Sequence, residues 1–413
     1  MLKKPFDNVK DAESHFNELY GENNSAQSAR YERAFNKYKA TFNEKTAYIA
    51  SSSGRVEVIG NHTDHNGGKV ISCAISLDTL AFFTPTDNGI IRVVSEGYKD
   101  IIVDTNTTPS YKCGNSHALV CGIVAYFKSH GFNVGGFNAF CTSNVCGGAG
   151  ISSSASFEVL IAEILNFLYN DGQLSAEQKA VASQYAENVY FGKPCGLLDQ
   201  SAIAYGGLKK LDFSDKSKIG VTEINNALSD YTLILINTGG SHADLTDEYA
   251  AVPAEMREVA NTLGVERLIE LSKEEFFNRL PEIYEKVSDR AILRAIHFYD
   301  ENERVDMAEN ALNRCDYPLF LDAVSKSGLS SLYKLQNCYV AGLKEQPIPK
   351  ALAITGEFLG DGANRVHGGG FAGCILNIVK NEKAESFIKN AKRFYDDNSI
   401  IRLHVRPVGT KVL

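Results

Sequence analysis

The sequence predicts a mixed α/β protein built from two domains. Its 413 residues are 44% hydrophobic, enough apolar material for more than one buried core. Residues 55–58 alternate polar and apolar side chains, which is typical of a strand, and residues 137–168 predict a strand, a glycine-rich loop and an apolar helix in that order. Residues 374–394 predict a strand followed by a helix. These patterns favour an α/β first domain and an α+β second domain.

The composition points to small-molecule ligands. A net charge of −8 and an isoelectric point near 5.7 oppose binding to nucleic acid or to an anionic membrane, because both partners need a basic face. The N-terminal residues lack the apolar core of a leader, and no apolar run approaches the length of a membrane span. The nine cysteines are scattered without CxxC pairs, which predicts reduced, mostly buried thiols. We therefore expect a cytoplasmic protein, a monomer, with no nucleic-acid or membrane partner.

The chain divides into an extension and two domains. Residues 1–46 are polar with scattered aromatic side chains, and we expect them to form a helical extension packed on the first domain. Residues 47–220 form the predicted first domain and residues 221–413 the second. The boundary follows from the polar stretch at 212–230, after which an apolar strand begins at 231–236. Helices are expected to dominate the hundred residues that follow.

Within the first domain we expect a strand from Tyr48 onward and a partner strand over 69–77. A third strand at 137–142 precedes the glycine- and serine-rich residues 147–156 and an apolar helix over 157–168. The next helix starts at a capping box and has an apolar stripe at every fourth residue, Val181, Tyr185 and Val189. On this geometry Glu187 points away from the stripe, and by itself it would belong to a solvated helix face.

The glycine- and serine-rich loop is a candidate phosphate site. It lacks the lysine and the spacing of a Walker A loop, but backbone N–H groups at a helix N-terminus still attract anions. The serine hydroxyls add donors and a candidate Mg²⁺ ligand. A run of this kind by itself could equally be a linker or a packing turn. The strand before it and the apolar helix after it favour the phosphate site.

Asp199 and Arg55 are candidate catalytic residues. Asp199 follows an apolar pair in a loop that Pro194 and Gly196 constrain. Alone, Asp199 could be a helix cap and Arg55 a structural ion-pair partner. Together, the arginine keeps the carboxylate ionised and adds positive charge where phosphoryl oxygens accumulate negative charge. The same arginine weakens the aspartate as a base, which phosphoryl transfer through a loose transition state tolerates.

Four segments in chain order resemble the galactokinase branch of the GHMP small-molecule kinases. Residues 54–68 resemble the galactokinase signature GRVNLIGEHTDYNGG, and residues 148–156 resemble the GHMP phosphate loop PxGAGLSSSAS. Residues 187–200 resemble ExxxxGxxCGxMDQ with its spacing kept, and residues 368–374 resemble GGGFGGC. The first segment is specific to the galactokinase branch rather than to GHMP kinases in general.

The resemblance implies the GHMP kinase two-domain fold, with an α/β N-terminal domain, a ferredoxin-like C-terminal domain and the active site between them. The implied reaction is ATP-dependent phosphorylation of the C1 hydroxyl of D-galactose to galactose 1-phosphate, with ATP and Mg²⁺ as cofactors. The implied catalytic residues are Asp199 and Arg55, and Mg²⁺ would lie between Ser154 and Glu187. The implied sugar-binding residues are Asn61, His62, Asp64, Gly196 and Tyr249. The implied ATP-binding residues are Gly148, Ala149, Gly150, Ile151, Ser152, Ser153, Ser154 and Ala155.

Departures from the signature leave the sugar open. Asn61 stands where the signature has Glu, Glu57 where it has Asn, and His65 where it has Tyr. Asn61 loses a charge where the family binds a sugar hydroxyl, although its amide can still accept a hydrogen bond. A GHMP kinase acting on another hexose, an amino sugar or a pentose is therefore one alternative. A non-catalytic sensor of sugar and ATP is another, but the fungal sensor of this kind lacks a Ser-Ala pair that residues 152–156 retain.

Overall fold

The computed structural model describes residues 4–21, 24–107, 114–145, 147, 150–224, 228–239 and 245–413. In this part of the chain one large sheet has eight strands, in the order β12-β1-β2-β5-β3-β4, with β6 paired to β2 and β7 paired to β6. Its strands are β1 (Tyr48–Ile59), β2 (Lys69–Thr86), β3 (Ile90–Ser95), β4 (Ile101–Asp104), β5 (Gly136–Ser143), β6 (Leu208–Asp212), β7 (Gly220–Glu223) and β12 (Lys411–Val412). The pairs are antiparallel except for β3 with β5, which is parallel.

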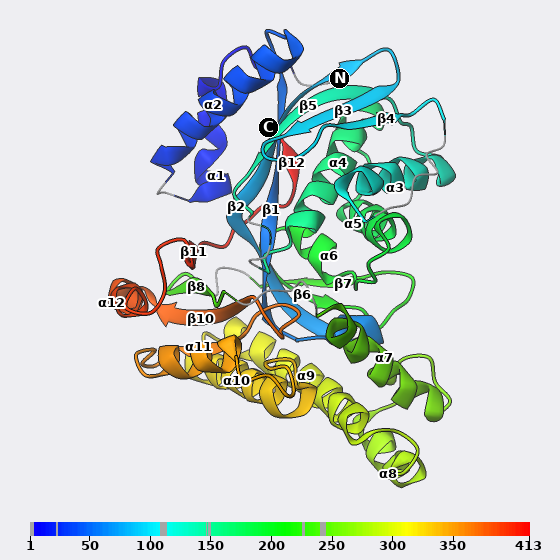
Figure 1. Ribbon diagram of the computed structural model, residues 1–413, viewed down its shortest axis with the longest axis vertical. Coiled ribbons are helices and arrows are strands. Elements are labelled where there is room, and N and C mark those ends of the chain that lie inside the picture. The colour runs from blue at the N-terminus through cyan, green and yellow to red at the C-terminus, as the bar shows by residue number, and fades with distance from the viewer. Residues whose placement is uncertain are drawn as a thin grey trace.

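Both faces of this sheet are covered. In β2, Leu80 and Phe82 pack against the N-terminal extension, whereas Ala81 and Phe83 pack against the helices on the opposite face, as the alternation of side chains in a strand requires. The extension consists of η1 (Lys10–His15), α1 (Phe16–Tyr20) and α2 (Ser25–Phe42). The helices on the other face include α3 (Ser116–Ser129), α4 (Ser153–Tyr169), α5 (Ala176–Tyr185), the π-helical turn η3 (Ala186–Phe191) and α6 (Leu198–Tyr205). Figure 1 shows the two groups of helices on opposite sides of β1 and β2.

A smaller antiparallel sheet follows, with the order β11-β8-β10-β9. Its strands are β8 (Tyr231–Asn237), β9 (Ala363–Val366), β10 (Cys374–Lys380) and β11 (Ile400–Leu403). The helices of this part are α7 (Thr246–Thr262), η4 (Leu268–Glu270), α8 (Lys273–Ile283), α9 (Asp289–Asn313), α10 (Tyr317–Ser330), the π-helical turn η5 (Ser331–Leu335), α11 (Pro347–Gly356) and α12 (Asn381–Ala391). One apolar core joins the two sheets, because Val56 of β1, Leu235 of β8 and Phe320 of α10 belong to the same buried cluster.

The mixed α/β fold class predicted from the sequence is confirmed, and η2 (Asp64–Asn66) follows β1 where the sugar signature lies. The last strand was not predicted: β12 pairs with β1, with Ala50 opposite Val412, so the C-terminal residues complete the first sheet. The division of the chain at residues 220/221 stays a prediction. No helix within the described ranges is long and apolar enough to cross a membrane.

A buried ion pair fastens the N-terminal extension to the sheet. Arg30 of α2 lies 2.6 Å from the Oδ1 atom of Asp78, whose side chain is fully buried in β2. The hydroxyl of Tyr20 donates to the other carboxylate oxygen at 2.7 Å. Burial opposes ionisation of Asp78, but the positive charges of Arg30 and Arg406 outweigh it and hold the pKa of this carboxyl below its ordinary value.

The substitution Arg30→Ala should lower the free energy of unfolding by about 3–5 kcal/mol, because it leaves the buried carboxylate without its main partner. Urea unfolding at pH 7 measures this difference. The matched control is Lys37→Ala, which removes an ion pair between the same helix and Glu96 but from a lysine whose side chain is 51% exposed. The control should cost about 1 kcal/mol or less. Equal effects of the two substitutions would contradict the anchoring role of Arg30.

Candidate active site

Arg55 of β1 brings Asp199 to the phosphate loop. Its Nε and Nη2 atoms lie 2.8 and 2.7 Å from the Oδ1 atom of Asp199, in the first turn of α6. Its Nη1 atom donates to the backbone carbonyl of Gly150. The other carboxylate oxygen accepts a hydrogen bond from the hydroxyl of Ser152. Both predicted catalytic residues therefore meet, and they meet beside the loop that was predicted to hold phosphate.

The close approach of the loop to β1 depends on Gly54. A Cβ atom there would lie 2.7 Å from the carbonyl oxygen of Ile151, and glycine avoids this clash because it has no Cβ atom. Ile151 and Ala155 are buried and anchor the loop, while Ser153 and Ser154 are partly exposed at the start of α4. Predicted ATP-binding residues 150–155 are thus contiguous at the N-terminus of this helix. Gly148 and Ala149 lie outside the described residues.

Glu187 lies in the π-helical turn η3 and is buried, with 4% of its surface exposed. The predicted apolar stripe was therefore wrong: Val189 is exposed, and the buried residues of this region are Ala182, Ser183, Ala186, Glu187 and Tyr190. The buried positions also recur at every fourth residue but one residue later, at Ala182, Ala186 and Tyr190, so the stripe was assigned to the wrong face. Glu187 belongs to this buried face and accepts a hydrogen bond from Ser154 of α4 at 3.2 Å.

The surroundings of Glu187 suit a hard cation. The hydroxyl of Ser154 and the carboxylate of Glu187 are oxygen ligands of the kind that Mg²⁺ prefers, and Mg²⁺ commonly takes one or two carboxylates together with substrate phosphates. Gln200 donates to Glu187 at 2.9 Å and to the neighbouring Glu158 at 3.1 Å. Burial and then the charge of Glu187 raise the pKa of Glu158 well above its ordinary value.

The predicted sugar-binding residues form a second group of contacts. A Cβ atom on Gly196 would lie 1.7 Å from the Oδ2 atom of Asp64, so only glycine allows this carboxylate to touch the 194–199 loop. The Nε2 atom of His62 lies 3.0 Å from the carbonyl oxygen of Gly369. Since a carbonyl only accepts, Nε2 carries the proton and Nδ1 of the neutral ring is left as an acceptor. The hydroxyl of Tyr249 donates to the carbonyl of Gly370 at 2.6 Å.

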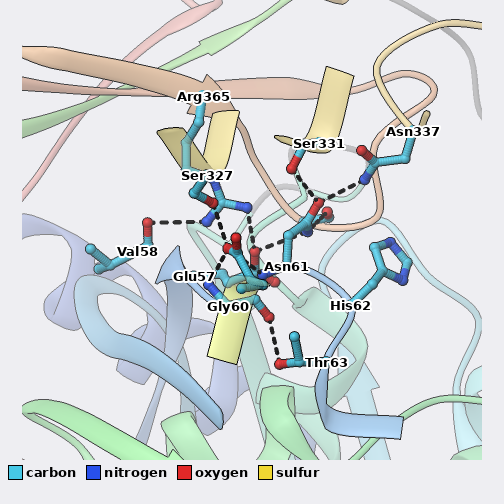
Figure 2. Close-up of polar contacts among 12 residues, drawn as sticks. Glu57, Val58, Gly60, Asn61, His62, Thr63, Ser327, Ser331, Asn337 and Arg365 are labelled. Atoms are coloured by element: carbon cyan, nitrogen blue, oxygen red, sulfur yellow. Dashed lines mark hydrogen bonds and ion pairs between the residues drawn. The ribbon is translucent and has the colours of Figure 1, made fainter. Parts of the chain in front are cut away.

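Asn61 differs from this group, because its side chain is fully buried. Its amide nitrogen donates to Glu57 and to the carbonyl of Gly368, and its amide oxygen accepts from Ser331 and Asn337. Figure 2 shows Asn61 between Glu57, Ser331 and Asn337, with His62 lying to one side. The amide that was predicted to bind the sugar thus has its four hydrogen-bonding positions filled by the protein.

The sequence did not identify several residues of this region: Arg365, Asn337, Ser331 and Gln200. Arg365 is fully buried and its Nη2 atom lies 2.8 Å from the carboxylate of Glu57, 308 residues away along the chain. The sequence places Glu57 on the polar face of an alternating strand, and only the structure shows that this strand buries both faces. A buried carboxylate requires a cationic partner, but the sequence does not say which one.

Comparisons with known proteins match these observations. Residues 36–85 match the family model for the galactokinase galactose-binding signature, and residues 118–207 match the model for the GHMP kinase N-terminal domain. The galactokinase of Lacticaseibacillus casei is 31% identical over 86% of this chain and 91% of its own length. The galactokinase of Clostridium beijerinckii is 30% identical over 83% of this chain and 88% of its own length.

Solved structures agree. The Lactococcus lactis galactokinase complexed with galactose superposes with a TM-score of 0.81 at 25% identity, over 94% of this chain and all of the other. The mevalonate kinase of Methanococcus jannaschii has a TM-score of 0.62 at 18% identity, over 86% and 98% of the two chains, and shares the fold. The fold and the site thus define a GHMP-type small-molecule kinase. The chain belongs to the galactokinase family within that class and is a sugar kinase.

Asp64 should make stability depend on pH. Burial, followed by the charges of Asp199 and Glu57, raises the pKa of Asp64 to about 6 from an ordinary value of 3.8. Between these values the folded protein binds a proton that the unfolded chain does not, so the wild type loses stability as the pH rises from about 4 to 6. The free energy of unfolding of Asp64→Asn, relative to that of wild type, should therefore rise by up to about 3 kcal/mol across this window and then stay constant.

Urea unfolding of both proteins at intervals between pH 4 and 8 measures the gain. The substitution Asp361→Asn, at a carboxylate that is 78% exposed, controls for the general loss of one negative charge. A difference between wild type and Asp64→Asn that stays constant with pH would contradict the raised pKa.

Proposed function

We propose that the protein transfers the γ-phosphoryl group of ATP to the C1 hydroxyl of D-galactose and releases galactose 1-phosphate and ADP. The observation that supports this most directly is the contact of Asp199 with Arg55 and Ser152 at the phosphate loop. A sugar hydroxyl needs an acceptor for its proton, and the phosphoryl group needs positive charge and N–H donors. Both requirements coincide at this place.

In this proposal the C1 oxygen forms the new bond to the γ-phosphorus while the bond from that phosphorus to the ADP oxygen breaks. Asp199 aligns the hydroxyl and accepts its proton late in the reaction. Arg55 holds its charge beside Gly150, where the phosphoryl oxygens would lie. A loose transition state needs mainly alignment and charge stabilisation, which these two residues would supply.

Sugar recognition falls to four of the predicted residues: His62, Asp64, Gly196 and Tyr249. The ionised carboxylate of Asp64 and the Nδ1 atom of His62 are acceptors for sugar hydroxyls. Gly196 lets the carboxylate of Asp64 approach the loop that holds Asp199. Tyr249 is bonded to the glycine run at residues 368–370, to which His62 is also bonded. Galactose is favoured over other sugars by the match of residues 36–85 to the galactose-binding signature and by the galactokinase relatives.

Magnesium would be held by Ser154 and Glu187, and when bound it would neutralise charge on the ATP phosphates. The proposed compartment is the cytoplasm, supported by cysteines that are free in the described part of the chain and mostly buried. The monomeric state and the two-domain division stay predictions.

Release of ADP from Mg-ATP should be fastest with galactose in a panel that also contains galactosamine, N-acetylgalactosamine, arabinose and glucose. Preference for another sugar would overturn galactose as the substrate, and binding of galactose and ATP without turnover would favour the sensor.

The substitution Asp199→Asn should lower kcat by about 10³-fold, because it removes the proton acceptor and the charge that pairs with Arg55. Circular dichroism and thermal unfolding show whether the variant is folded. A folded variant with near-normal kcat would remove Asp199 from the mechanism.

The substitution Glu187→Gln should raise the Mg²⁺ concentration needed for half-maximal turnover by about tenfold or more, since Mg²⁺ loses a carboxylate ligand. Titration of Mg²⁺ into protein freed of metal by a chelator measures this shift. Glu158→Gln is the matched control, because this buried carboxyl shares Gln200 with Glu187, whereas Ser154 donates to Glu187. Equal shifts for the two variants would contradict the assignment of Glu187.

A further inference from the structure

Two departures from the galactokinase signature touch each other. The signature has Asn at the position of Glu57 and Glu at the position of Asn61, so this chain holds the same two residue types in exchanged order. The amide nitrogen of Asn61 donates to the Oε1 atom of Glu57 at 3.0 Å. The two differences therefore have to be explained together.

The contacts of Asn61 leave no position for a ligand. A side-chain amide makes at most four hydrogen bonds. The nitrogen uses both of its protons on Glu57 and on the carbonyl of Gly368, which is 2.8 Å away. The oxygen accepts from Asn337 at 2.8 Å and from Ser331 at 3.2 Å. With the side chain fully buried, a sugar hydroxyl could bind Asn61 only by displacing one of these groups.

The main chain of Asn61 is held as well. Its N–H donates to the carboxylate of Glu301 at 3.3 Å, and its carbonyl accepts from His297 at 2.9 Å. Both partners are fully buried residues of α9. Asn61 is therefore fixed by side chains from α9, from η5 and from the segment after it, and by the glycine run at 368–370.

The carboxylate at position 57 has a partner that position 61 lacks. Glu57 is 3% exposed, and Arg365 of β9, which is fully buried, lies 2.8 Å from it. Arg365 also donates to the carbonyl of Val58 at 3.0 Å. A carboxylate at position 61 would instead face the carbonyl of Gly368, and two acceptors repel each other there.

The network reaches the sugar-binding residues through the glycine run. The carbonyl of Gly369 accepts hydrogen bonds from Asn337 at 3.1 Å and from His62 at 3.0 Å. This carbonyl therefore joins a partner of Asn61 to His62, the next residue of the loop at 60–68 between β1 and β2, which we call the sugar loop. His62 has a φ angle of 57°, a strained conformation that its surroundings must maintain. A shift of Asn61 would move His62 and then Asp64.

We propose that Asn61 is a positioning residue rather than a sugar ligand, and that Asn61, Glu57 and Arg365 act as one unit that fixes the sugar loop to the glycine run. This proposal rests on the proposed function, because it concerns affinity for the sugar of that reaction. The unit sets the position of His62 and Asp64, and the sugar's affinity follows from their position. The exchange of Asn and Glu keeps the contact between the two positions and places the charge beside Arg365.

Deoxy sugars separate positioning from direct binding. Inhibition constants of 2-, 3-, 4- and 6-deoxygalactose against galactose are measured for wild type, for Asn61→Ala and for the milder Ser331→Ala. Asn61→Ala should weaken the binding of galactose and of all four deoxy sugars by the same factor, about 10- to 100-fold, because the whole loop shifts. A loss that disappears for one deoxy sugar would identify a hydroxyl bound by Asn61 and overturn the proposal. Absence of galactose turnover in the wild type would instead overturn the proposed function.

A double-mutant cycle tests whether the residues act together. Glu57→Gln and Asn61→Asp each keep the side-chain shape, and combined they restore a hydrogen bond between the two positions in the opposite direction. Each single variant should raise KM for galactose about tenfold, while KM for ATP stays within about twofold of wild type. In the double variant, KM for galactose should be at least about fivefold lower than the value obtained by multiplying the two single rises. A double variant equal to that product would overturn the unit.

A buried amide outside the network serves as the control. Asn377 of β10 is fully buried and donates to the carbonyl of Ile234. Asn377→Asp should lower thermal stability while leaving KM for galactose unchanged. If it raised KM as much as Asn61→Asp, general destabilisation would explain the effect and the proposal would fail. If Asn61→Asp or Asn61→Ala did not fold, Ser331→Ala decides the matter: a rise of about threefold in KM, equal across the deoxy sugars, supports the proposal, and no rise overturns it.

Discussion

The buried guanidinium of Arg55 is the interaction on which the arrangement of the site depends. A charged group that is 6% exposed needs partners for its donors, and these partners come from segments far apart in the chain. Asp199 of α6 supplies a carboxylate oxygen and Gly150 a backbone carbonyl. By satisfying Arg55, the fold brings the phosphate loop and the carboxylate against β1. The same contacts that stabilise the buried charge therefore assemble the proposed reaction centre.

A second buried group organises the sugar side in the same manner. Asn61 lies two residues after the end of β1, and apart from Glu57 its side-chain partners come from residues 331–368. The turn after β1 supplies His62 and α7 supplies Tyr249, and the glycine run at 368–370 supplies the carbonyl oxygens to which both are bonded. Glycine is needed in that run because a Cβ atom on Gly369 would lie 2.6 Å from the ring of Tyr249.

The sequence predicted the strands around Tyr48 and Phe137 and the order of strand, loop and helix, because alternation and glycine content are local properties. It also identified Arg55 and Asp199, which the structure brings together. It misjudged the face on which Glu187 lies, because the larger apolar side chains Val181 and Val189 lie on the neighbouring face, whereas the buried face holds small residues such as Ala182, Ser183 and Ala186. It could not pair Glu57 with Arg365 across 308 residues, because a carboxylate in the sequence does not indicate which arginine or lysine lies beside it in the fold. The misjudged contacts are therefore those that depend on tertiary packing.

The placement of negative charge links these observations. Asp64, Asp199 and Glu57 lie close enough for the latter two to raise the pKa of Asp64, so the site already tolerates repulsion among carboxylates. Glu57 adds less to this repulsion than an unpaired carboxylate would, because Arg365 compensates its charge. A carboxylate at position 61 would lie three residues from Asp64 and face a carbonyl rather than a guanidinium. The exchanged order of Asn and Glu is thus the order that the positions of Arg365 and Gly368 favour in this chain.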